Sequence, residues 1–270
     1  MKVQNKVIVV TGGGSGMGRE LVLNLLGKGA MVAAIDINEA SLQETAKLAG
    51  SNAGALRVFV ADITNRLAIE ALAEKVINKF GHVDGIINNA GIIQPFIKVN
   101  DLSYEVIERV MNINFYGTLY LIKTFLPHLL TRPEAHIVDI SSMGGFLPVP
   151  GQTIYGASKA AVKLLTEGLH SELTGTNVRV TVVFPGGVKT NIMSNSGLAD
   201  RMSASSSEKA AQKILTADKA AAMIIEGMEQ NKYRVLVGKD ARIMDMLYRL
   251  NPAYAAGLIA KKMGALLSSK

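Results

Sequence analysis

Tyr155 and Lys159, four residues apart, are the residues of this chain whose types and spacing indicate chemistry most directly. The pattern around them predicts a helix from about Tyr155 to Thr174, and residues four apart lie on one face of a helix. A free tyrosine has a pKa near 10, so bringing it to about 7 takes about 4 kcal/mol. One ammonium about 4 Å away supplies about that much at an effective dielectric of 20, but only about 1 kcal/mol in water. The pair therefore predicts a tyrosine activated by Lys159 in a site partly closed to solvent.

The alternative is an exposed helix that carries this pair on its solvated face. Two other stretches favour chemistry. Ser142 precedes Tyr155 by thirteen residues, where the apolar strand pattern of 136–142 runs into Met143 and two glycines. A glycine-rich turn lies near the start of the chain.

This turn runs from Thr11 to Gly18, between an apolar strand pattern at 6–10 and a helical pattern at 19–28. In that context backbone N–H groups and the helix N-terminus bind an anion such as phosphate, and the missing Cβ atoms let it approach. The spacing departs from G-x-G-x-x-G, because the last position falls on Met17. A flexible turn without a ligand is the alternative.

A second strand pattern, at 31–35, ends in Asp36, eighteen residues after Gly18. A carboxylate at this separation accepts hydrogen bonds from the adenosine ribose and repels a 2′-phosphate, which favours NAD over NADP. The alternative is that Asp36 only precedes the next helix, which Asn38 caps.

Apolar runs and helical patterns alternate along most of the chain, which predicts an α/β fold. We expect one Rossmann-type, doubly wound domain with about seven parallel strands and helices on both faces. The predicted strands are 6–10, 31–35, 56–61, 83–87, 136–142, 178–184 and 233–237, and a long helix is predicted at 103–130. Because ligands bind at the carboxyl ends of parallel strands, the residues there predict one crevice. These residues are Thr11, Asp36, Asp62, Asn88, Ser142 and Pro185.

Composition excludes several classes of protein. The 270 residues are 49% hydrophobic and include no cysteine, which excludes disulfides, thiolate nucleophiles and cysteine-bound metals. The four histidines are scattered, so no metal site is predicted. A net charge of +7 suggests nucleic acid, but only seven Phe and seven Tyr accompany it, so this alternative is not favoured. With no room for a signal peptide and no apolar run of membrane length, a cytoplasmic protein is expected.

These motifs together resemble the short-chain dehydrogenase/reductase family, from Lys6 to about Gly238. The resemblance rests on the order of Thr11–Gly18, Asn88-Asn-Ala-Gly91, Asn114, Ser142, Tyr155-x-x-x-Lys159 and Pro185-Gly186. It implies an NAD-dependent oxidoreductase that transfers a hydride between NAD(H) and an alcohol or carbonyl substrate. It also implies a homodimer or homotetramer. An NAD-sensing protein of the same fold with little turnover is the alternative, although the loss of Tyr or Lys that would mark it is not seen.

The resemblance also implies roles for individual residues. Tyr155 would be the general acid or base, Ser142 would orient the substrate oxygen, Lys159 would lower the Tyr155 pKa and hold the nicotinamide ribose, and Asn114 would place a water that links Lys159 to solvent. The implied cofactor-binding residues, besides Tyr155 and Lys159, are Gly12, Ser15, Gly16, Met17, Gly18, Asp36, Ile37, Asp62, Ile63, Asn89, Ala90, Gly91, Pro185, Gly186, Val188 and Thr190.

The remaining stretches suggest a substrate site and an extension. An apolar loop at 144–150 is expected to wall the substrate pocket, and 191–207 is expected to form a flap over it. Apolar candidate walls favour a lipid-like, steroid-like or secondary alcohol substrate over a sugar. They are Ile92, Ile93, Phe96, Met143, Phe146, Leu147, Val149, Ile192 and Met193.

We expect residues 1–238 to form the catalytic domain and 239–270 a basic, amphipathic extension of it. The extension carries six Lys or Arg against two Asp. Its apolar stripes are Ile243, Met246, Leu247 and Leu250 before Pro252, and Ala255, Leu258, Ile259, Met263 and Leu266 after it. A stripe beside positive charge packs on the protein itself or lies on an anionic membrane. Packing is the favoured interpretation, with peripheral membrane contact as the alternative.

Overall fold

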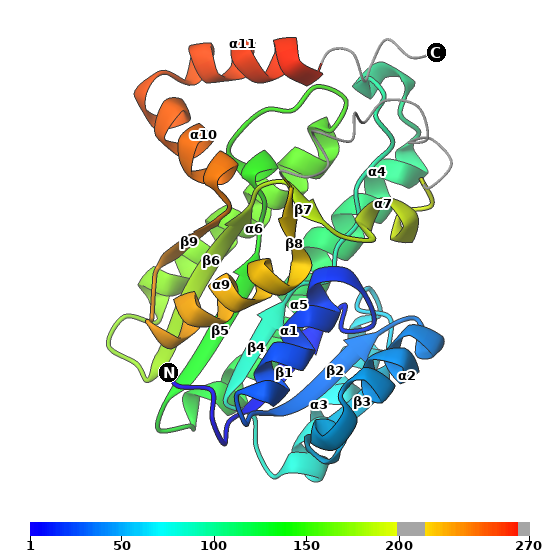
Figure 1. Cartoon of the computed structure of the whole chain (residues 1–270), viewed down its shortest axis with the longest axis vertical. Helices are drawn as coiled ribbons and strands as arrows, with labels where there is room; N and C mark the ends of the chain where they lie inside the picture. Colours follow the sequence, from blue (N-terminus) through cyan, green and yellow to red (C-terminus); the bar gives the residue numbers. More distant parts are fainter. Residues whose placement is uncertain (199–213, 264–270) are drawn as a thin grey trace.

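A seven-stranded parallel sheet forms the centre of the molecule, as predicted, in a computed structural model that describes residues 1–198 and 214–263 (Figure 1). The strand order is β3-β2-β1-β4-β5-β6-β9, and every neighbouring pair is parallel. The strands are β1 (Val7–Thr11), β2 (Met31–Asp36), β3 (Leu56–Val60), β4 (Gly85–Asn88), β5 (Ala135–Ile140), β6 (Val178–Pro185) and β9 (Arg234–Val237). The order reverses between β1 and β4, so the carboxyl ends of these two strands flank the crevice in which such folds bind nucleotides.

Helices cover both faces of this sheet. Alternate residues of β1 enter different cores, Ile8 and Val10 on one face and Val7 and Val9 on the other, as expected for a strand buried on both sides. The first face carries α1 (Gly16–Gly27), α2 (Glu39–Leu48) and α9 (Ala217–Glu229); the second carries α3 (Arg66–Phe80), α5 (Gly117–Leu130) and α6 (Thr153–Glu172). Each apolar run predicted as a buried strand therefore lies between two helical layers.

The predicted long helix at 103–130 is wrong in one respect, because a π-helical segment divides it. The helix begins as α4 (Tyr104–Met111), passes through the π segment (Asn112–Tyr116) and continues as α5. Single π turns insert one extra residue and often occur at functional sites. Here the segment holds the buried Asn114, and no change of residue pattern announces it.

A second, two-stranded sheet was not predicted. In it β7 (Val188–Lys189) pairs with β8 (Leu215–Thr216), which brings together the two ends of the segment that joins them. Strands of two residues are too short to show a hydrophobic period. A short helix, α7 (Ile192–Asn195), follows β7. The expected flap at 191–207 begins with this helix, while its part from 199 to 207 lies outside the described residues.

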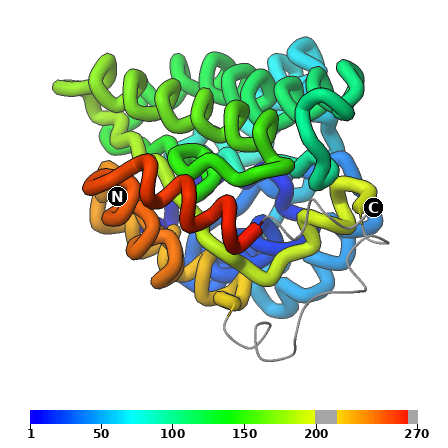
Figure 2. Tube along the Cα trace, turned by 90° about the horizontal axis from the view of Figure 1, so that it is seen from above, coloured from blue at the N-terminus to red at the C-terminus, as the bar shows by residue number. Residues whose placement is uncertain are grey.

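Two further helices lie beyond the carboxyl ends of the strands (Figures 1 and 2). They are α10 (Lys239–Leu250) and α11 (Pro252–Met263), with the break at Pro252 as predicted. They form a separate apolar cluster with the loop after β5, centred on Leu147, Met244, Ala255 and Ile259. Among residues 1–198 and 214–263, no helix is long and apolar enough to span a membrane.

Candidate active site

The glycine-rich turn after β1 has a backbone that side chains would obstruct. Gly12 and Gly16 have φ values of +68° and +51°, which favour glycine. A Cβ on Gly18 would overlap the carbonyl of Gly12. The turn therefore brings bare backbone and the N-terminus of α1 to the crevice, and this arrangement fits a phosphate group.

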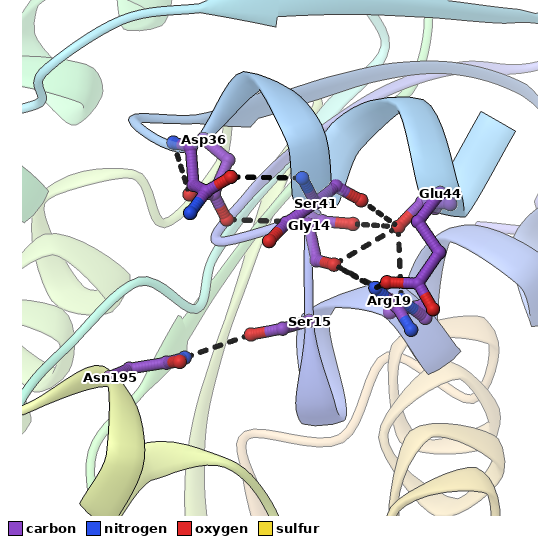
Figure 3. Close-up of polar contacts among 10 residues, drawn as sticks. Gly14, Ser15, Arg19, Asp36, Ser41, Glu44 and Asn195 are labelled. Atoms are coloured by element: carbon purple, nitrogen blue, oxygen red, sulfur yellow. Dashed lines mark hydrogen bonds and ion pairs between the residues drawn. The ribbon is translucent and has the colours of Figure 1, made fainter.

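Asp36 and Arg19 fix the outer side of this turn (Figure 3). The Asp36 carboxylate accepts hydrogen bonds from the backbone N–H groups of Gly14, at 3.0 Å, and Asn38, at 3.0 Å. The Arg19 guanidinium donates to the Gly14 carbonyl at 2.6 Å and pairs with Glu44. Asp36 is thus held at the end of β2, while Arg19 is engaged by other acceptors.

Asp36 lines an outer cavity of about 610 Å³, which also includes Ile37, Asp62 and Ile63. All four residues were predicted from the sequence to bind the cofactor, with Asp36 at the adenosine ribose. An inner cavity of about 200 Å³ adjoins it and shares Gly12, Ser15, Asp36, Ala90 and Gly91 with it. The two cavities together follow the crevice from β2 to β6.

The inner cavity brings together nearly all the other predicted site residues. Ser142, Tyr155 and Lys159 line it with the glycine turn and the residues after β6. Its predicted members are Gly12, Ser15, Gly16, Met17, Gly18, Asp36, Asn89, Ala90, Gly91, Ser142, Tyr155, Lys159, Pro185, Gly186, Val188 and Thr190. Thr11 and Asn88 lie at the ends of β1 and β4, next to residues that line the cavity. The Thr11 hydroxyl accepts from the Asn89 and Ala90 amides, each at 3.0 Å, and ties the end of β4 to β1.

Asn114 lies beneath the inner cavity and bonds to two elements. Its amide oxygen accepts from the Ile92 N–H at 2.9 Å, and its amide nitrogen donates to the Ile92 carbonyl at 3.0 Å and to Ser158 Oγ at 2.9 Å. The π segment thereby joins the end of β4 to α6. A buried amide with these partners fixes the backbone beside Lys159.

Tyr155 and Lys159 both line the inner cavity, and each is held by other groups in this conformation. The Lys159 ammonium donates to the Ile140 carbonyl at 2.9 Å. Burial raises the pKa of Tyr155, and the Ser142 hydroxyl beside it acts in the opposite direction. In this conformation burial is the largest influence on the pKa of Tyr155, and the ammonium is directed to a carbonyl. The lowering of the tyrosine pKa by Lys159 stays a prediction.

Asp139, a buried carboxyl whose charge acts on Lys159, was not identified from the sequence. Burial lowers the pKa of Lys159 to about 8, and the negative charge of Asp139 acts against this. Burial raises the pKa of Asp139 to about 6, while hydrogen bonds from Asn88 and Thr166 act in the opposite direction. These bonds are 2.7 Å and 2.9 Å long.

Gln94 is a second residue that sequence reasoning missed. It is fully buried, and its amide oxygen accepts from the backbone N–H groups of Ile154 and Tyr155, at 2.8 Å and 2.9 Å. These are first-turn donors of α6 that lack a partner within the helix. Gln94 thus caps the helix that carries Tyr155 from about sixty positions away, a distance over which no local signal operates.

The expected apolar walls divide between two places. Ile93 and Ile192 line the inner cavity, and Ile92 lines the outer cavity of the same crevice. Phe146, Leu147 and Val149 instead line a separate cavity of about 600 Å³ between their loop, α6 and α10. The expectation that the 144–150 loop walls the substrate pocket directly is therefore not met, because its apolar side chains pack toward the C-terminal helices.

Known proteins resemble this chain in sequence. The sequence model of the family described as short chain dehydrogenase matches residues 6–201. A Mycobacterium tuberculosis protein named as the oxidoreductase SadH is 36% identical over 262 residues, 95% of each chain. The 3-oxoacyl-[acyl-carrier-protein] reductase FabG of Thermotoga maritima is 35% identical over 190 residues, 70% of this chain and 77% of its own length.

Solved structures resemble it in fold. A short chain dehydrogenase/reductase from Burkholderia phymatum in complex with NAD aligns with a TM-score of 0.81 and 26% identity, covering 93% of this chain and 96% of the other. The closed form of a serine dehydrogenase complexed with NADP+ aligns with a TM-score of 0.73 and 30% identity, covering 80% and 86%. Both cofactors thus occur among proteins similar to this one.

Proposed function

Because the chain belongs to the short-chain dehydrogenase family of oxidoreductases, we propose that it transfers a hydride between NAD(H) and an apolar alcohol or carbonyl compound. The single observation that carries this proposal is the inner cavity. There Ser142, Tyr155 and Lys159 face the same space as the glycine turn. An acid–base group and a dinucleotide-binding turn in one cavity are what such a reaction requires.

The protein's own residues bind, orient and move a proton, while the bound cofactor supplies or accepts the hydride. Ser142 Oγ accepts from the Gly144 N–H at 3.0 Å. Its own O–H is therefore free to donate to the substrate oxygen. Tyr155 gives its proton to that oxygen during carbonyl reduction and takes it back during alcohol oxidation. Asn114 fixes the backbone beside Lys159, and Lys159 would hold the nicotinamide ribose.

The preference for NAD over NADP is supported by the outer cavity. Asp36 presents a carboxylate there, which would repel a 2′-phosphate. Arg19, which contacts the turn, is engaged by Gly14 and Glu44 (Figure 3). A screen of alcohols with NAD and with NADP, and of the matching carbonyl compounds with NADH and NADPH, read at 340 nm, tests both parts. Turnover with apolar alcohols and NAD is expected.

Two results would contradict the proposal. A larger kcat/KM with NADP than with NAD would show that Asp36 does not set the cofactor preference. NAD binding by calorimetry without turnover of any compound would instead support an NAD-sensing protein.

We also propose that the chain forms a homodimer or homotetramer through α4 to α6. Tyr104, Tyr116 and Leu164 on these helices are 79%, 41% and 68% exposed. Large exposed apolar side chains on neighbouring helices favour an interface between subunits. Light scattering at micromolar concentration tests this assembly, and a monomer under those conditions would contradict it.

A further inference from the structure

The two C-terminal helices have apolar side chains on two sides, and only one side is covered. Inward, Met244, Ala255 and Ile259 pack with Leu147. Outward, four large apolar side chains are left exposed, which we call the outer face. These are Ile243, Met246, Leu250 and Tyr254, at 53%, 56%, 77% and 60% exposure.

This division settles how the predicted stripes are used. The described part of the stripe on α11 packs inward, as favoured from the sequence, and Leu266 lies outside the described residues. The stripe on α10 is divided, because Leu247 packs inward while Ile243, Met246 and Leu250 point outward. Positions i, i+3 and i+7 share one side of a helix. Packing on the protein therefore accounts for five of the eight described stripe residues and leaves one side of α10 uncovered.

Positive charge surrounds the outer face. Five basic residues of α10 and α11 are exposed: Lys239, Arg242, Arg249, Lys261 and Lys262. Of the two acids on α10, Asp245 is buried and pairs with Arg234 and Arg249, at 3.1 Å and 2.9 Å. Asp240 accepts from the Gly187 N–H at 2.6 Å. Asp240 is itself exposed, so the exposed surface of these helices is apolar and carries five cations against one carboxylate.

We propose that the outer face of α10 and α11 docks on an anionic lipid bilayer. Amphipathic helices with apolar side chains on one side and cations beside them lie in the membrane interface, with the apolar residues among the acyl chains. A second copy of the chain fits this surface poorly. A twofold contact would place the same cationic patch against itself. An anionic surface complements both features of the face.

The position of the helices agrees with such docking. The corner between α10 and α11 lies at the edge of the molecule, beyond the carboxyl ends of the strands (Figure 1). The same helices cover the loop that follows Ser142. The bilayer would therefore contact the protein at the carboxyl ends of the strands, the end of the sheet that holds the crevice and, if the proposed function holds, an apolar substrate.

Cosedimentation of the full-length protein with lipid vesicles tests the docking without reference to catalysis. One set of vesicles contains phosphatidylcholine alone, and the other contains phosphatidylcholine with one third phosphatidylglycerol. Binding is expected only to the anionic vesicles, and it should weaken as salt rises from about 0.1 M to about 0.5 M, because salt screens exposed charges. Protein that stays in the supernatant with both vesicles at 0.1 M salt would overturn the proposal.

Matched variants assign the binding to this face. Ile243→Ser combined with Met246→Ser and Leu250→Ser should lower the partition coefficient at least about tenfold, since the apolar contact is lost. The control combines Leu48→Ser and Leu67→Ser on α2 and α3, where the side chains are 56% and 67% exposed. It should bind as the parent does. Equal binding by the triple variant, or a smaller oligomer in the triple variant without vesicles, would overturn the proposal, the latter in favour of a contact between copies.

Discussion

The inner and outer cavities of the crevice differ in how their functional groups are held. At the outer cavity, Asp36 is partly exposed and bonds to backbone groups no more than 22 positions away. At the inner cavity, Lys159 is buried, and the backbone beside it is fixed by Asn114, which binds Ser158 across 44 positions. The outer cavity is thus built by a local motif, and the inner one by contacts between distant elements. Burial then displaces the pKa values of the inner groups.

The largest effect is expected at the inner cavity, from Tyr155→Phe. The change removes the transferable proton and keeps the ring, so kcat/KM should fall by about 10²–10⁴-fold, the range for a general acid–base group. The Kd for NAD, measured by calorimetry, should stay close to that of the parent because the outer cavity is intact. Activity within a few-fold of the parent would remove Tyr155 from the mechanism.

At the outer cavity, Asp36→Ala should change specificity more than rate. A hydrogen bond to a charged group contributes about 1.5–3 kcal/mol, so the ratio of kcat/KM for NAD to that for NADP should fall by about ten- to a hundredfold. Asp62→Ala is the matched control. Its carboxylate is exposed and accepts from Thr64. It should leave the ratio nearly unchanged, and an equal loss in both variants would show that Asp36 does not choose the cofactor.

The difference between local contacts at the outer cavity and long-range contacts at the inner cavity also explains which features could be predicted from the sequence. Asp36 and the glycine turn are recognisable because their partners lie in one βα unit, and the seven strands because each is an apolar run of four to eight residues. Gln94 was missed because its partners, Ile154 and Tyr155, are about sixty positions away. The π segment at Asn112–Tyr116 was missed because its extra residue leaves no change in the apolar pattern. Long-range polar contacts are decided by tertiary packing, which residue spacing does not encode.

The third prediction concerns Asp139, the buried carboxyl behind Lys159. Its charge raises the pKa of Lys159 against the lowering by burial. Asp139→Asn should therefore move the Lys159 pKa further below about 8, on the order of one unit, or about 1.4 kcal/mol. If the lysine must be charged, the alkaline decline of kcat/KM for carbonyl reduction should shift to lower pH by the same amount.

The amide is a close match for the carboxyl at this position. Thr166 Oγ1 lies 2.6 Å from the Val162 carbonyl and can donate there, so it can accept from the new amide. Thr166→Val is the control, because it removes one hydrogen bond and keeps the Asp139 charge. That variant should unfold at a lower temperature with little change in the pH profile. An unshifted alkaline limb in Asp139→Asn would show that Asp139 supports the fold alone.

The smallest effect is expected where α7 borders the crevice. Two bonds tie this helix and the next residue down. Asn195 Nδ2 donates to Ser15 Oγ of the glycine turn at 2.8 Å, in an exposed position (Figure 3). Ser196 Oγ accepts from the buried Ile93 N–H at 3.0 Å. The two bonds are similar in length and differ mainly in their access to water.

Water can replace the exposed bond but not the buried one. Asn195→Ala should therefore raise the Kd for NAD only about two- to threefold and leave kcat unchanged, at the low end of the range of about 0.5–1.5 kcal/mol for a hydrogen bond. Ser196→Ala leaves a buried N–H without a partner, which costs about 1–3 kcal/mol and should lower the melting temperature as well. In calorimetry, the effects of Asn195→Ala and Ser15→Ala should be less than additive in the double variant, because both changes remove the same bond. Additive effects on the Kd would mean that the bond between Asn195 and Ser15 does not hold α7 against the glycine turn. Equal effects of Asn195→Ala and Ser196→Ala on the melting temperature would contradict the importance of burial at this crevice.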